Sequence, residues 1–459
     1  MSDSRNTNAK HARYIQMTET PVPKLITQLA IPTIISMLVT GIYNTADTFF
    51  VGKISTQATA AVGLVFSVMA IIQALGFFCG HGSGNYISRM LGAGEQREAD
   101  EMASTGFALS ILIGITVAIL GNLFLEPLAV LVGATPTTLE DTKTYMRIIL
   151  IGAPFMMSQF VINNQLRFQG SAIYAMFGLL AGAIVNIALD PLLILVCHLG
   201  VAGAAIATVA GQIMSFCVLL IGSRRGPNIR LRPSNVRLNP HYLLEITNGG
   251  APSLFRQGLA SVSTLLLNTQ AGMLGGDAAI AGMSVSTRVT MLLMSALIGF
   301  GQGYQPMCSF NYGAGLKKRV RDGFFFCVKW GTIFLTVIAV LCFLFAPQII
   351  SWFRDDPDVI AVGQVALRWQ SAVLPVAAAT VMTNMMLQSM GRGLKASIMA
   401  SAKNGYCFIP LILILPRFLG LLGVEITQPI ADVLALIISI PLGYSELRYM
   451  TKDDPVMPE

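Results

Sequence analysis

Two aspartates lie deep inside long apolar stretches of this chain. Asp47 lies in the stretch "YNTADTFFVGK" and Asp190 lies in "NIALDPLLI". Tyr43 and Asn186 each precede one of these acids by four residues, so in a helix each acid has a polar neighbour on the same face. Because a carboxylate at the centre of a membrane helix costs about 2.5–3.5 kcal/mol on insertion scales, intramembrane acids are expected to be functional.

The two acids could share one cation-binding pocket. Pro191 lacks a backbone N–H and prevents a preceding carbonyl from being bonded normally, so that carbonyl could also bind a cation. With Asn186 and the hydroxyl of Thr208 in the next apolar stretch, Asp47 and Asp190 would form an all-oxygen pocket. Such a pocket suits sodium, and two carboxylates that repel each other can also bind a proton near neutral pH. Alternatively, each acid bonds a buried hydroxyl or backbone group and joins two helices.

Further polar and polarizable side chains at membrane depth could line a second cavity or hold a substrate. The arginines among them could pair with a backbone carbonyl, a lipid headgroup or an aspartate in the last apolar stretch. The methionines could line a cavity for varied ligands, although core packing or lipid contact accounts for them more simply. These candidates are Asp432, Arg256, Arg288, Gln159, Asn163, Asn384, Gln388, Met291 and Met294.

Composition places the elements that must position these residues in a membrane. The 459 residues are 54% hydrophobic and 12% charged, whereas soluble domains carry about 25% charged residues. Apolar runs of about 20 residues, the length that crosses a bilayer as a helix, recur along the chain. The sequence predicts an all-α integral membrane protein with twelve transmembrane helices, at residues 27–51, 60–82, 103–124, 144–166, 174–196, 201–222, 245–271, 279–303, 324–346, 361–388, 396–416 and 423–446.

Basic residues predict the orientation of these helices. The loops on the side of the termini hold most of the Lys and Arg residues, and the opposite loops hold only Lys53, Lys143, Arg354 and Arg417. This positive-inside bias predicts a multi-pass membrane protein with both termini in the cytoplasm. The net charge of +7 therefore reflects topology and not a nucleic-acid partner, and the first residues show no removable signal peptide.

The second half of the chain repeats the first at an offset of about 220 residues. "AIPTIIS" corresponds to "GAPSLFR", "LGAGEQREAD" to "YGAGLKKRVRD", and "NNQLRFQG" to "TNMMLQSMG". Two repeats of six helices enter the membrane from the same side, and such repeats pack as two pseudo-symmetric lobes with the substrate path between them. The expected organisation is a cytoplasmic N-terminal tail (1–24), an N-lobe (25–222), a basic cytoplasmic connector (223–243), a C-lobe (244–447) and a cytoplasmic C-terminal tail (448–459).

The repeat separates structural from functional polar groups, because structural needs should recur in both halves. The acids do not recur: Asp47 corresponds to about Leu267 or Asn268, and Asp190 corresponds to the stretch near Pro410. The chain also lacks a Walker motif and a zinc-protease motif. Any pumping is therefore expected to use an ion gradient, with no cofactor.

Several of these motifs together resemble the multidrug and toxic compound extrusion (MATE) family. "IPTIISMLVTGIYNTADTFFVGKI", "AAVGL", "NIALDPLLI", "GVAGAAIAT" and "GFGQGYQPMCSFNYGAG" occur in the order typical of that family, and the first-half acids resemble its DNA-damage-inducible-protein-F-like (DinF-like) branch. The resemblance implies two six-helix lobes that open alternately and export cationic, amphiphilic drugs in exchange for sodium or protons. It also implies a first-lobe cation site at Asp47, Asn186, Asp190 and Thr208, with Tyr43 beside it. A possible sodium ion would bind at the first four.

We therefore expect a secondary active multidrug efflux antiporter of the bacterial inner (cytoplasmic) membrane with small-molecule substrates, acting as a monomer. One alternative is a lipid-linked precursor flippase of the same broad superfamily, which Arg256 and Arg288 keep open. A more remote alternative is an integral-membrane lipid-modifying enzyme, although the sequence offers no nucleophile, metal cluster or general-base pair beyond the two acids.

Overall fold

The computed structural model describes residues 2–225 and 227–452, without the side chains of residues 2–7, 42–49, 56 and 452. Within these ranges the regular elements are all helices. They are α1 (Ser2–Glu19), α2 (Val22–Gly52), α3 (Thr56–Ala93), α4 (Gln96–Leu123), α5 (Leu125–Leu131), α6 (Leu139–Phe168), α7 (Ala172–Pro191), η1 (Leu192–Val196), α8 (Gly200–Ser223), η2 (Pro233–Asn235), α9 (Pro240–Gly313), α10 (Lys317–Leu344), α11 (Ala346–Phe353), α12 (Pro357–Val373), α13 (Val376–Ser389), α14 (Gly393–Ser401), η3 (Ala402–Tyr406), α15 (Phe408–Leu419) and α16 (Leu421–Lys452).

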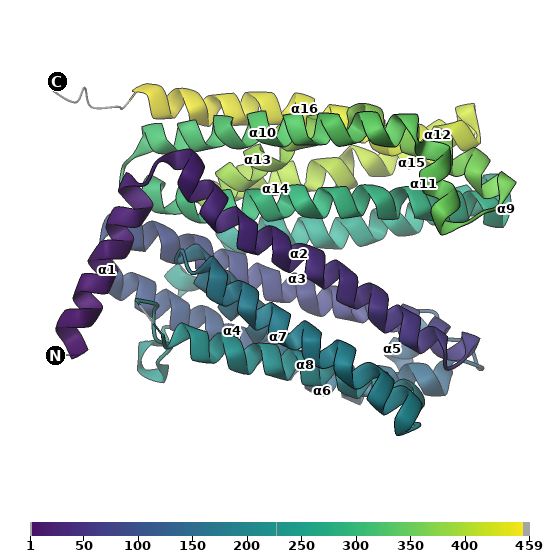
Figure 1. Cartoon of the computed structure of the whole chain (residues 1–459), viewed down its shortest axis with the longest axis horizontal. Coiled ribbons are helices and arrows are strands. Elements are labelled where there is room, and N and C mark those ends of the chain that lie inside the picture. The colour runs from purple at the N-terminus through teal and green to yellow at the C-terminus, as the bar shows by residue number, and fades with distance from the viewer. Residues whose placement is uncertain (1, 226, 453–459) are drawn as a thin grey trace.

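The helices form two bundles, α2–α8 and α9–α16, which lie one below the other in Figure 1. In the described part of the chain, ten helices are long and apolar enough to cross a membrane, and the pair α12 and α13, bent by 58°, makes up to eleven. The longest of these, α9, contains two spans, because its backbone breaks at Gly276. The expected all-α membrane fold is confirmed, and the twelve predicted spans agree with this count once α9 is divided.

A glycine allows the chain to turn back inside α9. Gly276 has φ 62° and ψ −156°, in the left-handed half of backbone space where residues with a Cβ are strained. Leu267 and Ala271 before the turn share one hydrophobic cluster with Ala279 and Met283 after it. The two halves of α9 therefore pack against each other as separate spans.

The duplication appears in the structure as matched contacts. The Asn163 side chain donates a hydrogen bond to the Ala175 carbonyl at 2.9 Å, and the corresponding Asn384 donates to the Ala396 carbonyl at 2.7 Å. This agreement shows that Asn163 and Asn384 join the fourth and fifth spans of their own repeats. We therefore assign both asparagines a structural contact.

The two lobes touch along a seam that glycines make possible. A Cβ on Gly92 of α3 would collide with the Phe310 carbonyl of the other lobe, and a Cβ on the corresponding Gly313 would collide with the Arg89 carbonyl. Nearby, the Arg89 guanidinium forms an ion pair with Glu245 of the other lobe at 2.9 Å. We call the contacts of Gly92, Gly313, Arg89 and Phe310 the seam.

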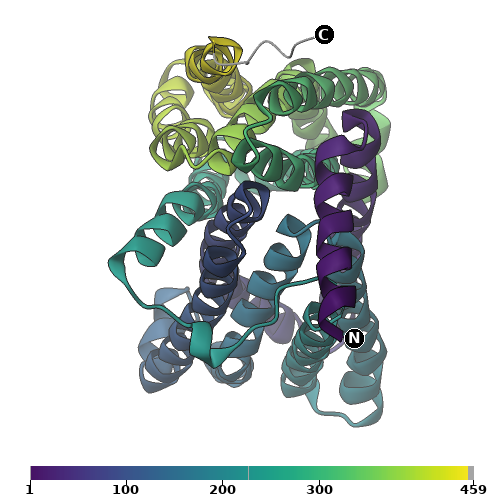
Figure 2. The same cartoon turned by 90° about the vertical axis from the view of Figure 1, so that its left-hand side faces the viewer.

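The seam lies at the end of the molecule that holds α1 and the end of α16, and the ribbons of the two lobes diverge toward the opposite end (Figure 1). A tail was expected for the first residues, but the structure has helix α1 there, running across this end from one lobe to the other (Figure 2). The Arg13 guanidinium donates to the Gln169 carbonyl of the first lobe, and Asn311 of the second lobe donates to the Met17 carbonyl. Helix α1 therefore links both lobes beside the seam.

Candidate cation site

Close packing of α7 and α8 brings two predicted cation ligands together. A Cβ on Gly182 of α7 would lie 2.6 Å from the Gly211 carbonyl oxygen of α8, so both positions require glycine for this approach. The Asn186 amide donates to the Thr208 hydroxyl at 3.5 Å, and these side chains are 2% and 4% exposed. Asp190, one turn after Asn186, is fully buried at 0% exposure.

A cavity of about 50 Å³ opens beside this pair. It has room for water molecules or a small cation, since one water needs about 10–15 Å³ of such volume. Four helices supply its polar lining, with Thr40 from α2, Gln159 from α6, Asn186 from α7, and Thr208, Gln212 and Ser215 from α8. Gln159 is thus a wall residue of this first-lobe cavity.

Several buried oxygens of this lining have no hydrogen-bond partner in the described part of the chain: Asn186 Oδ1, Gln159 Oε1, Gln212 Oε1 and Ser215 Oγ. Buried polar atoms in folded proteins nearly always have a partner. Their convergence from three helices therefore indicates a bound cation or ordered water. The oxygens suit a hard cation, and the Gln212 Nε2 donor, which also lacks a partner among the described residues, suits water.

The backbone after Asp190 is irregular, as Pro191 predicts. Helix α7 ends at Pro191 and continues as the π-helical turn η1, in which the Cys197 N–H bonds the Leu192 carbonyl at 2.9 Å. Because Pro191 has no N–H, the carbonyl four residues earlier loses its usual helical donor. π-Helical turns occur frequently at functional sites, and this one begins directly beside the buried carboxylate.

The side chains of Tyr43 and Asp47 lie outside the described residues. Both positions belong to helix α2, which packs against α7. On the same helix, Thr40 is described, and it lines the cavity. A contribution of Tyr43 and Asp47 to the site stays a prediction.

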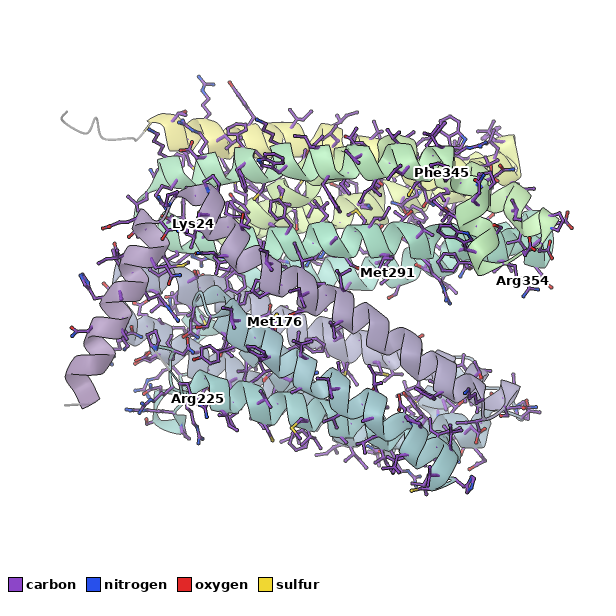
Figure 3. The ribbon with its side chains drawn as sticks, in the orientation of Figure 1. Lys24, Met176, Arg225, Met291, Phe345 and Arg354 are labelled. Carbon is purple, nitrogen blue, oxygen red and sulfur yellow. The ribbon has the colours of Figure 1, made fainter. Side chains whose placement is uncertain are left out.

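The second-lobe candidates do not gather into one site. Asp432 pairs with Lys403 at 3.2 Å and accepts a hydrogen bond from Gln428. Of the alternatives for Arg256 and Arg288, a pair with Asp432 is not among the described ion pairs. Lys403 lies in the irregular turn η3, which sequence spacing did not place beside α16. Arg288 and Met291 are exposed, whereas Met294 packs against the second-lobe core. Figure 3 labels Met291 on α9, between the ends of the molecule.

Arg256 and Gln388 belong to a different polar cluster. The Arg256 guanidinium donates to Asn384 Oδ1 at 3.3 Å, and Gln388 donates to the Gly249 carbonyl at 2.7 Å. Neither residue has a described hydrogen bond with the Lys403–Asp432 pair. This cluster is not part of the first-lobe cavity.

Sequence reasoning missed Thr40, Gln212 and Ser215. The spacing of Thr208, Gln212 and Ser215 by four and three residues places them on one helix face. That polar stripe in an otherwise apolar span was a usable signal. Thr40 carried no comparable signal, because its hydroxyl bonds the Ser36 carbonyl as many helical threonines do.

A larger residue at position 211 should open the α7–α8 contact. Overpacking costs about 1–3 kcal/mol, which corresponds to a cation affinity about 5–150-fold weaker in Gly211→Val. Cation-dependent protection of the purified protein against thermal unfolding would measure this. Gly63→Val is the control, because nothing lies within 4 Å of a Cβ there. Equal cation affinity in both variants would mean that the α7–α8 approach does not shape the site.

A duplicated, two-lobed membrane bundle with a buried polar cavity defines the class of secondary transporters. The MatE family model matches residues 32–192 and again residues 252–414, at the offset that the motifs predict. The chain therefore belongs to the MatE family of membrane transporters and is not an enzyme.

Curated relatives and solved structures that cover 95% of this chain agree with this assignment. The chain is 27% identical to multidrug export protein MepA of Staphylococcus haemolyticus over 441 residues, covering 95% of this chain and 96% of that protein. It is 28% identical to MepA of Staphylococcus aureus over 443 residues, with the same coverage. Its structure matches a MATE transporter in complex with MaL6 with a TM-score of 0.90, 27% identity and coverage of 95% and 99%. It also matches the outward-facing conformation of a multidrug resistance MATE transporter with a TM-score of 0.89, 27% identity and coverage of 95% and 98%.

Proposed function

We propose that this chain exports cationic amphiphilic compounds across the membrane in exchange for sodium ions or protons. The observation that carries this proposal is the cluster of buried oxygens without described partners on α6, α7 and α8, next to the fully buried Asp190. Support for the substrate class comes from the relatives named as multidrug export proteins. The family resemblance of the Asp47 and Asp190 motifs favours the DinF-like branch.

Mutual exclusion between the coupling cation and the substrate would couple import of the cation to export of the substrate. A cation in the first-lobe cavity neutralises Asp190, and Asp47 would supply a second carboxylate from a position two helical turns after Thr40 in the sequence. A positively charged substrate near the same carboxylates is then repelled by the cation. Each charge that crosses the membrane field is worth about 2.3 kcal/mol per 100 mV, which is enough to drive accumulation.

We further propose a bacterial inner-membrane location with both termini in the cytoplasm. Lys24 and Arg225 lie at the end of the molecule that holds the termini, whereas Arg354 lies at the opposite end (Figure 3). Positive loops face the cytoplasm in such membranes. With this orientation the seam would close the cytoplasmic side, and the lobes would diverge toward the outside.

Reconstituted protein tests the transport proposal. Proteoliposomes with the chain are loaded with ethidium as a cationic probe, and a sodium or proton gradient is imposed separately. We expect efflux driven by one of the two gradients and abolished by the matching ionophore. Efflux that ignores both gradients would contradict antiport, and turnover of a lipid by the protein in detergent would instead favour the enzyme alternative.

A further inference from the structure

A donor-rich polar cluster joins the lobes between the cation site and the seam. It contains Arg167 of α6 and His81 of α3 in the first lobe, and Ser253, Arg256 and Gln302 of α9 in the second. Arg167 is 2% exposed and His81 is 1% exposed. Arg256 is partly exposed. We call these five residues the arginine cluster.

The hydrogen bonds of the arginine cluster have a defined direction. Arg167 donates to Gln302 Oε1 and also contacts His81 Nε2 at 3.1 Å. Because a guanidinium can only donate, His81 Nε2 accepts and His81 Nδ1 carries the proton toward Ser253 Oγ, 3.1 Å away. Ser253 Oγ also faces donors from Gln388 at 2.9 Å and from Arg256 at 3.5 Å. Three donors therefore converge on one hydroxyl oxygen.

The described acceptors of the arginine cluster are all neutral: Arg167 donates to Gln302 Oε1, His81 Nε2 and Asn164 Oδ1. No ion pair among the described residues includes Arg167 or Arg256, and Arg167 Nε is buried without a partner among them. Arg256 has five N–H donors, yet its described acceptors, Asn384 and Ser253, lie at the long distances of 3.3 and 3.5 Å. Buried guanidinium groups are normally paired with an acid. The cluster thus has positive charge and donors that an anionic group could use.

The repeat indicates that neither arginine is required by the architecture. At the offset of the matched motifs, Arg167 corresponds to Gln388 and Arg256 corresponds to Ser36. Helices in the same places of the other repeat therefore pack without a guanidinium. Residues that the architecture requires should recur in both repeats. Arg167 and Arg256 do not recur, so we infer that their charges have a role other than packing.

Arg256 lies where the lobes begin to separate. Ser253, one turn earlier on α9, still contacts His81 of the first lobe, and Gly250, a further turn back, contacts Phe78 of the first lobe. Arg256 has described hydrogen bonds only within its own lobe and is partly exposed. Arg256 is therefore placed at the edge of the contacts between the lobes, and His81 and Ser253 connect it to Arg167.

We propose that Arg256, supported by Arg167, binds the carboxylate or a similar anionic group of a zwitterionic amphiphilic substrate. A guanidinium binds a carboxylate through two parallel charge-assisted hydrogen bonds, which gives both affinity and orientation. The cationic part of the same molecule is then free to face the acids of the first lobe. This inference rests on the proposed export of amphiphilic cations and assigns a residue to the anionic group of those substrates that carry one.

A matched pair of dyes tests the proposal. One is a xanthylium dye with a free carboxylate, and the other is its methyl ester, which has the same cation without the anionic group. Binding of each dye to the purified protein is measured by fluorescence polarisation in neutral detergent. For Arg256→Ser, which restores the residue of the first repeat, we expect the free-acid dye to bind about tenfold more weakly or worse, because a charge-assisted bond is lost. Ester binding should stay within about twofold.

Two further variants keep the test decisive. Arg256→Lys keeps the charge without the fork geometry, so we expect intermediate affinity for the free acid. Arg167→Gln should weaken free-acid binding less than Arg256→Ser, because Arg167 supports Arg256 only indirectly, through His81 and Ser253. Repeating the measurement with added anionic phosphatidylglycerol distinguishes a lipid phosphate as the occupant, because lipid would compete with the free acid in the wild type.

An equal loss of acid and ester binding in Arg256→Ser, or no change in either, would overturn the proposal. Competition by phosphatidylglycerol that removes the wild-type preference for the free acid would instead assign the site to a lipid headgroup and would also overturn it as a substrate site. Gradient-driven efflux of the ester dye is measured in a separate experiment. If no efflux occurred, the proposed antiport would be contradicted, but the comparison of free-acid and ester binding would still test the role of Arg256.

Discussion

Asp190→Asn should strongly reduce gradient-driven export while leaving the folded protein in the membrane. The asparagine keeps the size of the side chain but removes the negative charge of a fully buried carboxylate. Interactions of a charged group contribute about 1.5–3 kcal/mol, so we expect cation affinity and coupled efflux about 10–100-fold lower. Ethidium efflux from proteoliposomes under a sodium or proton gradient measures the effect.

Asp277→Asn is the matched control, because Asp277 is an exposed acid beside the α9 break. It should export at the wild-type rate. If Asp190→Asn exported as fast as Asp277→Asn, with equal amounts of folded protein, Asp190 would be a structural residue that joins helices and not a coupling residue.

Gly92→Val and Gly313→Val should keep the two lobes apart at the seam. A Cβ at either position collides with a backbone carbonyl of the other lobe, which cannot move as a flexible side chain can. The overpacking cost of about 1–3 kcal/mol falls on the seam-closed state alone. We therefore expect the population of that state to fall about 5–150-fold relative to a state with the seam open.

Spin labels at two exposed positions, Arg97 on the first lobe and Leu316 on the second, would report this change as a distance distribution. Gly258→Val is the control, because nothing lies within 4 Å of a Cβ at that α9 position. The two seam variants should shift toward longer distances, and the control should match the wild type. An unchanged distribution in Gly92→Val and Gly313→Val would show that the lobes do not separate along this seam.

The repeat made much of the fold predictable from sequence. Aligning the two halves pairs Gly92 with Gly313, and the structure places both glycines against the opposite lobe. It also pairs Asn163 with Asn384, whose hydrogen bonds are equivalent. These agreements follow from physics, because a duplicated backbone presents the same packing demands twice, and only residues that satisfy them recur.

Interactions that occur once were harder to predict. The Lys403–Asp432 ion pair depends on the irregular turn η3, whose geometry is not encoded by an apolar period. Helix α1 has a polar composition, so hydropathy gave no reason to expect it against the lobes. In the cation site, spacing predicted Asn186 and Asp190, but Gln159 and Thr40 reach the cavity through helix packing that one sequence does not specify.

The arginine cluster shows the same limit of prediction from sequence. Sequence reasoning placed Arg256 at membrane depth, but it could not pair it with Ser253 and Asn384, nor connect it to His81 across the lobes. The contacts of Arg256 with Asn384 and of Ser253 with His81 join residues more than 100 positions apart. They become visible only when both lobes are assembled.

Cation release on substrate binding tests the central claim most directly. Ethidium is added to purified protein in lightly buffered detergent solution, and proton release is followed with a pH indicator and sodium release with a sodium-selective electrode. We expect binding to release one of the two cations from the wild type and to release none from Asp190→Asn. Undiminished release from Asp190→Asn would show that the coupling cation binds elsewhere and would contradict the first-lobe site.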